Sequence, residues 1–199
     1  MAQINLYLAD VQGRVNDSER AIITGKLGAW MMRISGLVQG VSAVQIGWSS
    51  DAGRPGLGPA DTLVYVTTDV DRSIIAANGG NASQAISDPK VLGLTEVSAA
   101  NSRALSEVYL ARAVSPSELA GAAFHETAHN KSLQDNGMHQ GKDGLLMAAP
   151  HYGLAPTQAN LDFLAKFILT AVKQTIVPQN TLKNAWYGPG SSQSSPSKP

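Results

Sequence analysis

The chain of 199 residues contains no cysteine, which excludes disulfides, thiol nucleophiles, iron–sulfur clusters and cysteine-ligated zinc. It has no excess of charge either, because 15 basic side chains balance 15 acidic ones. This balance removes the electrostatic attraction that draws many proteins to nucleic acid or to a membrane surface. Any metal ion would have to be held by nitrogen and oxygen atoms, and only 4 histidines are present to supply nitrogen.

Long hydrophobic runs are also absent. No uncharged apolar stretch approaches the roughly 18–20 residues that cross a bilayer, because the two candidate stretches are interrupted by Lys26, Arg33, Asp162, Lys166 and Lys173. The N-terminus lacks the basic start and the continuous apolar core of a signal peptide. We therefore expect a soluble monomer that binds no membrane and no nucleic acid and is cytoplasmic by default, with secretion by another route left open.

The hydrophobic pattern predicts an α+β fold. Alternating apolar residues predict strands at residues 4–11, 44–48, 63–67, 91–97 and 106–113. Apolar residues at three- and four-residue spacing predict helices at residues 17–40 and 116–132 and a last helix opened by Pro156 and Thr157. The opening order of strand, helix, strand and strand is expected of a mixed sheet with a crossover helix on one face. Residues 78–90 are expected to be irregular, and residues 178–199 to form a flexible tail.

Two helix starts have recognisable caps. Asp17 or Ser18 can cap the first long helix. Its predicted core-facing side chains are Ile23, Leu27, Trp30, Met31, Ile34, Leu37 and Val38. At the second start, Ser115-Pro116-Ser117-Glu118 combines a capping box with proline at the first helical position, so a helix is expected from Pro116 to about Ser132.

That second helix contains His125-Glu126-Thr127-Ala128-His129, an HExxH motif. Histidines four residues apart lie on one helical face, so both imidazoles can reach one metal ion. The intervening Glu126 lies beside that face, where it can act on a metal-bound water without being a ligand itself. This is the arrangement of zinc hydrolysis, in which the metal acidifies a water and the glutamate moves its proton.

A catalytic zinc normally has three protein ligands and one open position. No glutamate follows Glu126 in the sequence, which excludes the peptidases whose third ligand is a glutamate on a later helix. The remaining candidates are His139, His151 and a few aspartates. His139 is favoured because Gly137 can let the chain leave the helix and turn back under the metal. Asp143 is the alternative third ligand, as aspartate is in the aspzincins.

These residues resemble the metzincin metallopeptidases, whose signature HExxHxxGxxH precedes a methionine-bearing turn. The resemblance extends from about residue 3 to 177, and it includes Gly144-Leu145-Leu146-Met147 as the methionine turn and Leu92-Gly93-Leu94-Thr95 as a glycine-bearing strand. It differs in spacing, since nine residues separate His129 from His139 where the family has five.

The resemblance implies a zincin-like fold in a single catalytic domain over residues 1–177, with a twisted mixed β-sheet, a crossover helix, an active-site helix and a C-terminal helix. It implies Zn²⁺ as cofactor and a peptide or protein as substrate. The implied zinc ligands are His125, His129 and His139, with Glu126 as general base, and Tyr152 resembles the tyrosine that stabilises the oxyanion. Residues 99–105 would be the edge strand along which an extended peptide lies.

Several of these side chains can also have a purely structural role. Met147 can simply fill the core, Tyr152 can be a packed or surface tyrosine, and His151 is expected to be solvated or to support a ligand from behind. Asn130 and Lys131 are expected on the solvated side of the helix. Two functions remain beside the peptidase: a zincin-fold metal-binding or structural protein without turnover, and a zinc hydrolase of non-peptide amides.

Overall fold

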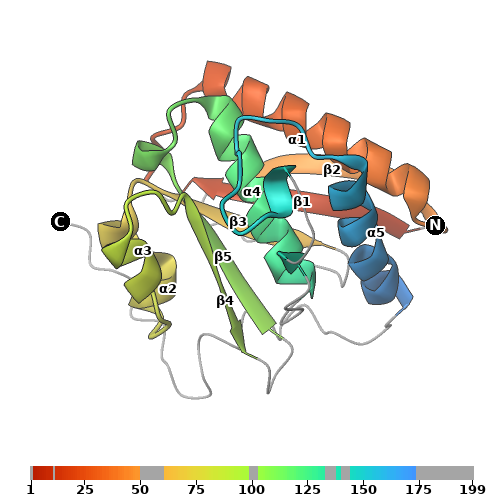
Figure 1. Cartoon of the computed structure of the whole chain (residues 1–199). Helices are drawn as coiled ribbons and strands as arrows, with labels where there is room; N and C mark the ends of the chain where they lie inside the picture. The colour runs from red at the N-terminus through yellow and green to blue at the C-terminus, as the bar shows by residue number, and fades with distance from the viewer. Residues whose placement is uncertain are drawn as a thin grey trace.

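The structure is a computed structural model that describes residues 2–10, 12–49, 61–98, 103–132, 138–139 and 144–173. It contains a mixed five-stranded sheet flanked by helices, an α+β arrangement as the sequence predicts (Figure 1). The strands are β1 (Ala2–Asp10), β2 (Val41–Ser49), β3 (Thr62–Thr67), β4 (Gly93–Ser98) and β5 (Arg103–Tyr109). The helices are α1 (Asp17–Leu37), α2 (Ile74–Ala77), α3 (Ser83–Ser87), α4 (Pro116–Ser132) and α5 (Gln158–Lys173). Short 3₁₀ turns lie at Val70–Arg72, Leu110–Arg112 and Gly144–Leu146.

The sheet has the strand order β2-β1-β3-β5-β4. The first four strands of this order are parallel, and α1 is the crossover between β1 and β2. The last strand, β4, runs antiparallel to β5 and, in the described part of the chain, pairs with no other strand. One edge of the sheet therefore carries an antiparallel strand whose outer side has no described strand partner.

The N-cap of helix α1 lies one residue earlier than predicted. Asn16, rather than Asp17 or Ser18, is the N-cap: its side chain accepts a hydrogen bond from the backbone N–H of Glu19 at 3.0 Å, and the Glu19 carboxylate accepts from the backbone N–H of Asn16 at 2.9 Å. The predicted core face is buried from Ile23 to Ile34 and again at Val38, but Leu37 is 46% exposed because the neighbouring Val38 takes the place in the core. The prediction for Leu37 was therefore wrong.

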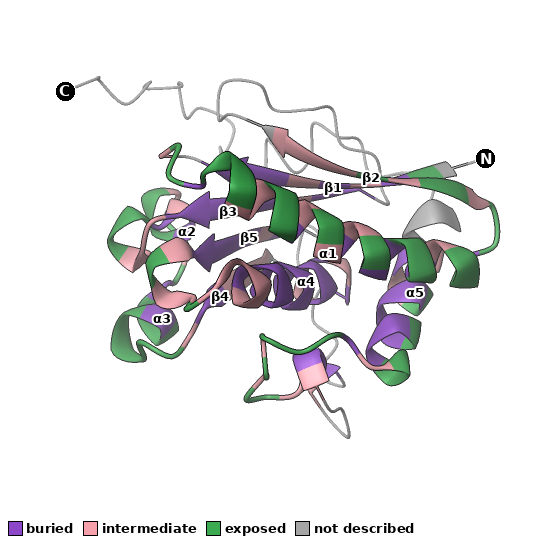
Figure 2. Ribbon diagram, turned by 90° about the horizontal axis from the view of Figure 1, so that it is seen from above, coloured by how far each residue is buried: buried purple, intermediate pink, exposed green. Residues whose placement is uncertain are grey.

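Helix α4 is the most deeply buried helix in the described part of the chain. In Figure 2 it lies beside α1, and most of its ribbon has the colour of buried residues; it packs against α1 and against β3, β4 and β5 of the sheet. Small side chains such as Ala120, Ala122 and Ala123 let it approach its neighbours, and Phe124 packs edge-to-face on Trp30 of α1 at 5.8 Å between ring centroids. The HExxH motif therefore sits in the core of the fold, and its histidines are not ordinary surface residues.

Three predicted boundaries are corrected by the structure. Residues 78–90 contain the short helix α3, so this segment is not wholly irregular. The strand predicted at residues 106–113 ends at Tyr109, after which the chain forms a 3₁₀ turn. The predicted edge strand at residues 99–105 is also wrong: the edge is β4, residues 99–102 lie outside the described residues, and residues 103–105 belong to β5 inside the sheet.

Helices α4 and α5 have the predicted positions. Ser115 accepts a hydrogen bond from the N–H of Glu118 at 3.3 Å at the start of α4, and the helix spans the predicted residues Pro116–Ser132. Helix α5 begins directly after Thr157. Among the described residues, none of the helices is both long enough and apolar enough to cross a membrane.

Candidate metal centre

The two histidines of the HExxH motif face one another across one turn of α4. Their Nε2 atoms lie 3.1 Å apart, and their ring centroids lie 4.8 Å apart. His125 is only 5% exposed, because its ring is surrounded by His129, His139, Tyr152 and the backbone oxygen of Leu145. The four-residue spacing thus places two ring nitrogens at one point, as helical periodicity requires.

His139 joins this pair from outside the helix. Its ring centroid lies 5.3 Å from that of His125 and 4.9 Å from that of His129. One ligand atom from each of the three side chains lies within 4.8 Å of the other two, and among the described residues this is the one such group of three potential metal ligands. The predicted His139 is therefore brought to the motif despite the nine-residue gap, whereas Asp143 lies outside the described residues.

A 3₁₀ turn at Gly144–Leu146 orients two of the three rings. Nδ1 of His125 lies 2.5 Å from the backbone oxygen of Leu145, and Nδ1 of His139 lies 3.0 Å from the backbone oxygen of Leu146. A carbonyl oxygen can only accept, so each Nδ1 must carry the proton and donate it. This leaves Nε2 of both rings unprotonated when the rings are neutral, which is the form that binds a metal.

Burial keeps the two helical histidines neutral. It lowers the pKa of His125 to about 4, against a smaller opposing effect of the Leu145 carbonyl. Burial also lowers the pKa of His129 to about 3, with help from the neighbouring His125 and His139. Three converging imidazoles, two of them with a fixed tautomer, fit the nitrogen ligand set of a catalytic zinc.

Glu126 lies between the two helical histidines and is only 2% exposed. Its Oε2 accepts a hydrogen bond from Oγ1 of Thr95 on β4 at 2.7 Å. Burial raises the pKa of Glu126 to about 8, the Thr95 bond lowers it, and the charge of Glu107 raises it further. The carboxyl therefore titrates near neutral pH, as a general acid and base should.

Gly93 of β4 leaves the space that Glu126 occupies. A Cβ atom at this position would lie 2.7 Å from Cγ of Glu126 and 2.9 Å from the backbone oxygen of Glu107. Both distances are too short for real atoms. Residue 93 must therefore be glycine if β4 and Glu126 are to keep this arrangement.

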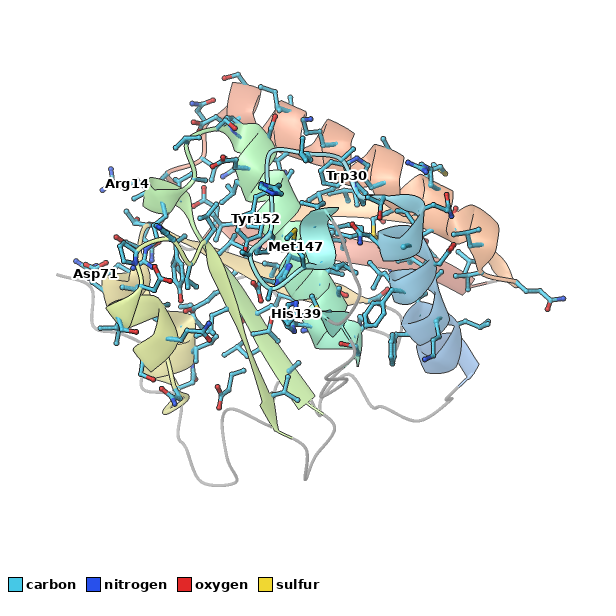
Figure 3. All side chains as sticks on the ribbon, in the orientation of Figure 1. Arg14, Trp30, Asp71, His139, Met147 and Tyr152 are labelled. Atoms are coloured by element: carbon cyan, nitrogen blue, oxygen red, sulfur yellow. The ribbon has the colours of Figure 1, made fainter. Side chains whose placement is uncertain are left out.

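Tyr152 approaches the histidines from the segment that follows the 3₁₀ turn. Its ring packs edge-to-face on His125 at 5.7 Å between centroids, and Figure 3 shows Tyr152, Met147 and His139 together beside α4. Gly121 of α4 permits this contact, since a Cβ there would lie 2.0 Å from the backbone oxygen of Tyr152. Burial, with the charge of Glu126, raises the pKa of Tyr152, so its hydroxyl stays protonated and can donate a hydrogen bond.

The histidines and Glu126 open onto a cleft of about 870 Å³. One wall is formed by residues 90–95 at the start of β4, and the other by residues 148–154. His151 lines the cleft but is exposed and does not belong to the cluster of three imidazoles. The cleft is large enough for several residues of an extended chain between its two walls.

Two residues predicted to be solvated are instead packed against the sheet. Asn130 is 8% exposed, and its Nδ2 donates to Oγ of Ser106 at 3.1 Å. Nζ of Lys131 donates to the backbone oxygen of Asp61, and burial lowers the pKa of Lys131 to about 8. Both predictions failed because α4 is covered on nearly every side, which the sequence pattern of the helix alone does not reveal.

The sequence did not identify the residues that support the site. Thr95 holds Glu126, the backbone of Leu145 and Leu146 orients two histidines, and Gly121 admits Tyr152. The sequence offered one signal for these contacts: Gly93 lies inside a predicted strand and Gly121 inside a predicted helix, where a glycine can mark the close approach of another group.

No protein-family model, no curated protein and no solved structure matches this chain. Relatives therefore supply neither a family nor a function. The inference of function depends on the three imidazoles, on Glu126 and on the cleft.

Proposed function

We propose that this protein is a zinc-dependent metallopeptidase with a metzincin-like fold. The observation that carries the proposal is the convergence of His125, His129 and His139 within 4.8 Å beside the buried Glu126. His139 would complete the three protein ligands that a catalytic zinc normally has. The resemblance of the motif, the glycine-bearing strand and the following turn to metzincins supports the same function.

Zn²⁺ at this centre would acidify a water and polarise the scissile carbonyl. Glu126 accepts the proton of the attacking water and passes it to the leaving amine. In the metal-free protein the pKa of Glu126 is about 8 because burial disfavours the carboxylate, and a bound Zn²⁺ would lower this pKa and favour the form that accepts the proton. The protonated hydroxyl of Tyr152 would donate a hydrogen bond to the developing oxyanion.

The edge strand β4 supports a peptide as the substrate. The backbone N–H of Tyr109 donates to the oxygen of Leu92 at 2.8 Å, which makes these two residues a hydrogen-bonded pair. In an antiparallel ladder such pairs alternate, so the backbone groups of Gly93, Thr95 and Val97 point away from β5. An extended peptide can add to this edge through main-chain hydrogen bonds and lie along the cleft past Glu126.

The proposal is tested by measuring bound metal and proteolysis together. Purified protein is analysed for zinc by elemental analysis, and the wild type, Glu126→Gln and Glu118→Gln are assayed on casein and on a peptide library. Glu118 is the matched control because it also lines the cleft on α4, two turns before Glu126. We expect one equivalent of zinc in all three proteins and cleavage that is lost only in Glu126→Gln.

Other outcomes would contradict the zinc peptidase or favour one of the two alternative functions. Protein that holds no zinc, even after zinc is added, would contradict the metal centre. One equivalent of zinc without cleavage that depends on Glu126 would favour a metal-binding protein without turnover. Hydrolysis of small acyl amides but not of peptides would favour the non-peptide hydrolase.

A further inference from the structure

Three consecutive peptide units of the 3₁₀ turn are tied to side chains around the metal centre. The oxygens of Leu145 and Leu146 accept from Nδ1 of His125 and of His139. On the preceding peptide unit, the N–H of Leu145 donates to Oδ1 of Asn160 at 3.1 Å. The side chain of Asn160 is thus linked to the ring of His125 through a single residue, Leu145.

Asn160 is completely buried and belongs to the first turn of α5. Its Oδ1 also accepts from the backbone N–H of Thr157 at 3.2 Å, and its own N–H donates to Oγ1 of Thr157 at 3.3 Å. This reciprocal pair resembles a capping box, with asparagine where glutamate or glutamine is usual. The cap fixes the position of Oδ1 rigidly, and that same oxygen holds the turn.

The turn is built closely around this side chain. Gly144 has φ +61°, a conformation that favours glycine, and a Cβ there would lie 3.1 Å from both Oδ1 of Asn160 and Cγ2 of Thr157. Leu145 and Leu146 are fully buried on either side of their shared peptide. The turn therefore has little room to move unless Asn160 moves.

We infer that Asn160 is a positioning residue of the metal centre, which sets metal affinity by fixing the carbonyls that orient His125 and His139. This inference rests on the metal-binding part of the proposed function. Loss of Oδ1 leaves the buried N–H of Leu145 without its acceptor, which favours a shifted turn. Outer partners of metal-bound histidines typically change metal affinity by about 10–100-fold when they are mutated.

The test compares the zinc affinity of three variants with that of the wild type by competition with a chromophoric chelator. Asn160→Leu removes the acceptor at similar size, Asn160→Asp keeps an oxygen at the Oδ1 position, and Thr157→Val removes the cap hydroxyl but leaves the Asn160–Leu145 bond. We expect Asn160→Leu to bind zinc about 10–100-fold more weakly, and the other two to stay within about threefold of the wild type.

Two outcomes would overturn the inference. The first is an Asn160→Leu protein with the zinc affinity of the wild type, which leaves the metal centre itself intact. The second is an equal loss in Thr157→Val, which would make Asn160 only a helix cap. A wild-type protein that binds no zinc would contradict the proposed function together with this inference.

A measurement on the wild type covers the case in which Asn160→Leu does not fold. Hydrogen exchange of the Leu145 amide is followed in the metal-free protein and after zinc is added. We expect a protected amide whose exchange slows further with zinc, because ordering of the rings and ordering of the turn are coupled. Exchange at the rate of an unstructured peptide, or protection that does not change with zinc, would overturn the inference.

Discussion

The hydroxyl of Thr95 on the edge strand β4 donates a hydrogen bond to Oε2 of Glu126 on α4, at 2.7 Å. The same hydroxyl lies 2.8 Å from Oγ of Ser106, which holds it in place. The bond favours the ionised carboxylate, while burial favours the neutral acid, and the pKa of Glu126 is about 8 as a result. The strand that is proposed to bind the substrate is therefore hydrogen-bonded directly to the proposed general base.

Replacing Thr95 with valine should shift the pH dependence of catalysis. Without the hydroxyl the pKa of Glu126 rises, so the base is protonated over a wider range of pH. We expect the acid limb of kcat/KM to move to higher pH by about one unit, and the rate at pH 7 to fall about tenfold. Thr95→Ser should restore the profile, and an acid limb unchanged in Thr95→Val would refute the role of this bond.

The stability of the metal-free protein should depend on the ionisation of Glu126 between pH 4.5 and about 8. Its pKa is raised from 4.5 to about 8 in the folded state, so its contribution to stability is complete below pH 4.5 and is lost as pH rises from 4.5 to about 8. His125 and His129 have lowered pKa values, so their contribution is lost as pH falls below 6.5.

Glu126→Gln should therefore remove the loss between pH 4.5 and about 8 and keep the loss that the histidines cause below pH 6.5. We expect the variant to exceed the wild type by roughly 1 kcal/mol or more at pH 8.5, measured by urea unfolding in the presence of chelator. A stability difference between the two proteins that stays constant from pH 5 to pH 8.5 would show that folding does not raise the pKa of Glu126.

Zinc should stabilise the protein through His139. A ligand that binds only the folded state at 100 times its Kd adds about 2.7 kcal/mol, which appears as a rise in Tm. We expect most of this gain to disappear in His139→Ala and to remain in His151→Ala, since His151 lines the same cleft without joining the cluster. A full zinc effect in His139→Ala would assign the third ligand elsewhere, and Asp143→Ala would then be examined.

Gly93→Ala should lower both the stability of the fold and the activity that depends on Glu126. Its Cβ would lie 2.7 Å from Cγ of Glu126, so the strand or the carboxyl must shift. We expect a loss of about 1–3 kcal/mol in the free energy of unfolding, together with a loss of activity of tenfold or more. Gly25→Ala in α1 is the control: its Cβ meets no atom within 4 Å, and it should stabilise the protein by about 0.5–1 kcal/mol.

Tyr152→Phe should lower kcat while leaving zinc affinity unchanged. The phenol stays protonated because burial raises the pKa of Tyr152, and only its hydroxyl can serve the oxyanion. We expect kcat to fall about 10–100-fold with KM nearly constant, measured by steady-state kinetics on the best peptide substrate. A drop in Tm without a change in kcat would make Tyr152 a packing residue.

Much of the fold was predictable where its signals are local. The capping box at Ser115 placed α4 at residues 116–132, and alternating apolar residues located all five strands to within a few residues. Features that depend on distant residues were missed. The edge position of β4, the short helix α3 and the burial of Asn130 follow from how the sheet and helices pack, which no local pattern specifies.

The sequence by itself determined that His125 and His129 share one helical face with Glu126 beside them, because the period of the α-helix fixes side chains four residues apart. Only the tertiary structure decided that His139 reaches that face across nine residues and that Thr95 meets Glu126. It also decided that Asn160 holds the turn that orients two rings. These contacts join a helix, an edge strand, a turn and a second helix, and their distances are set by core packing rather than by any spacing along the chain.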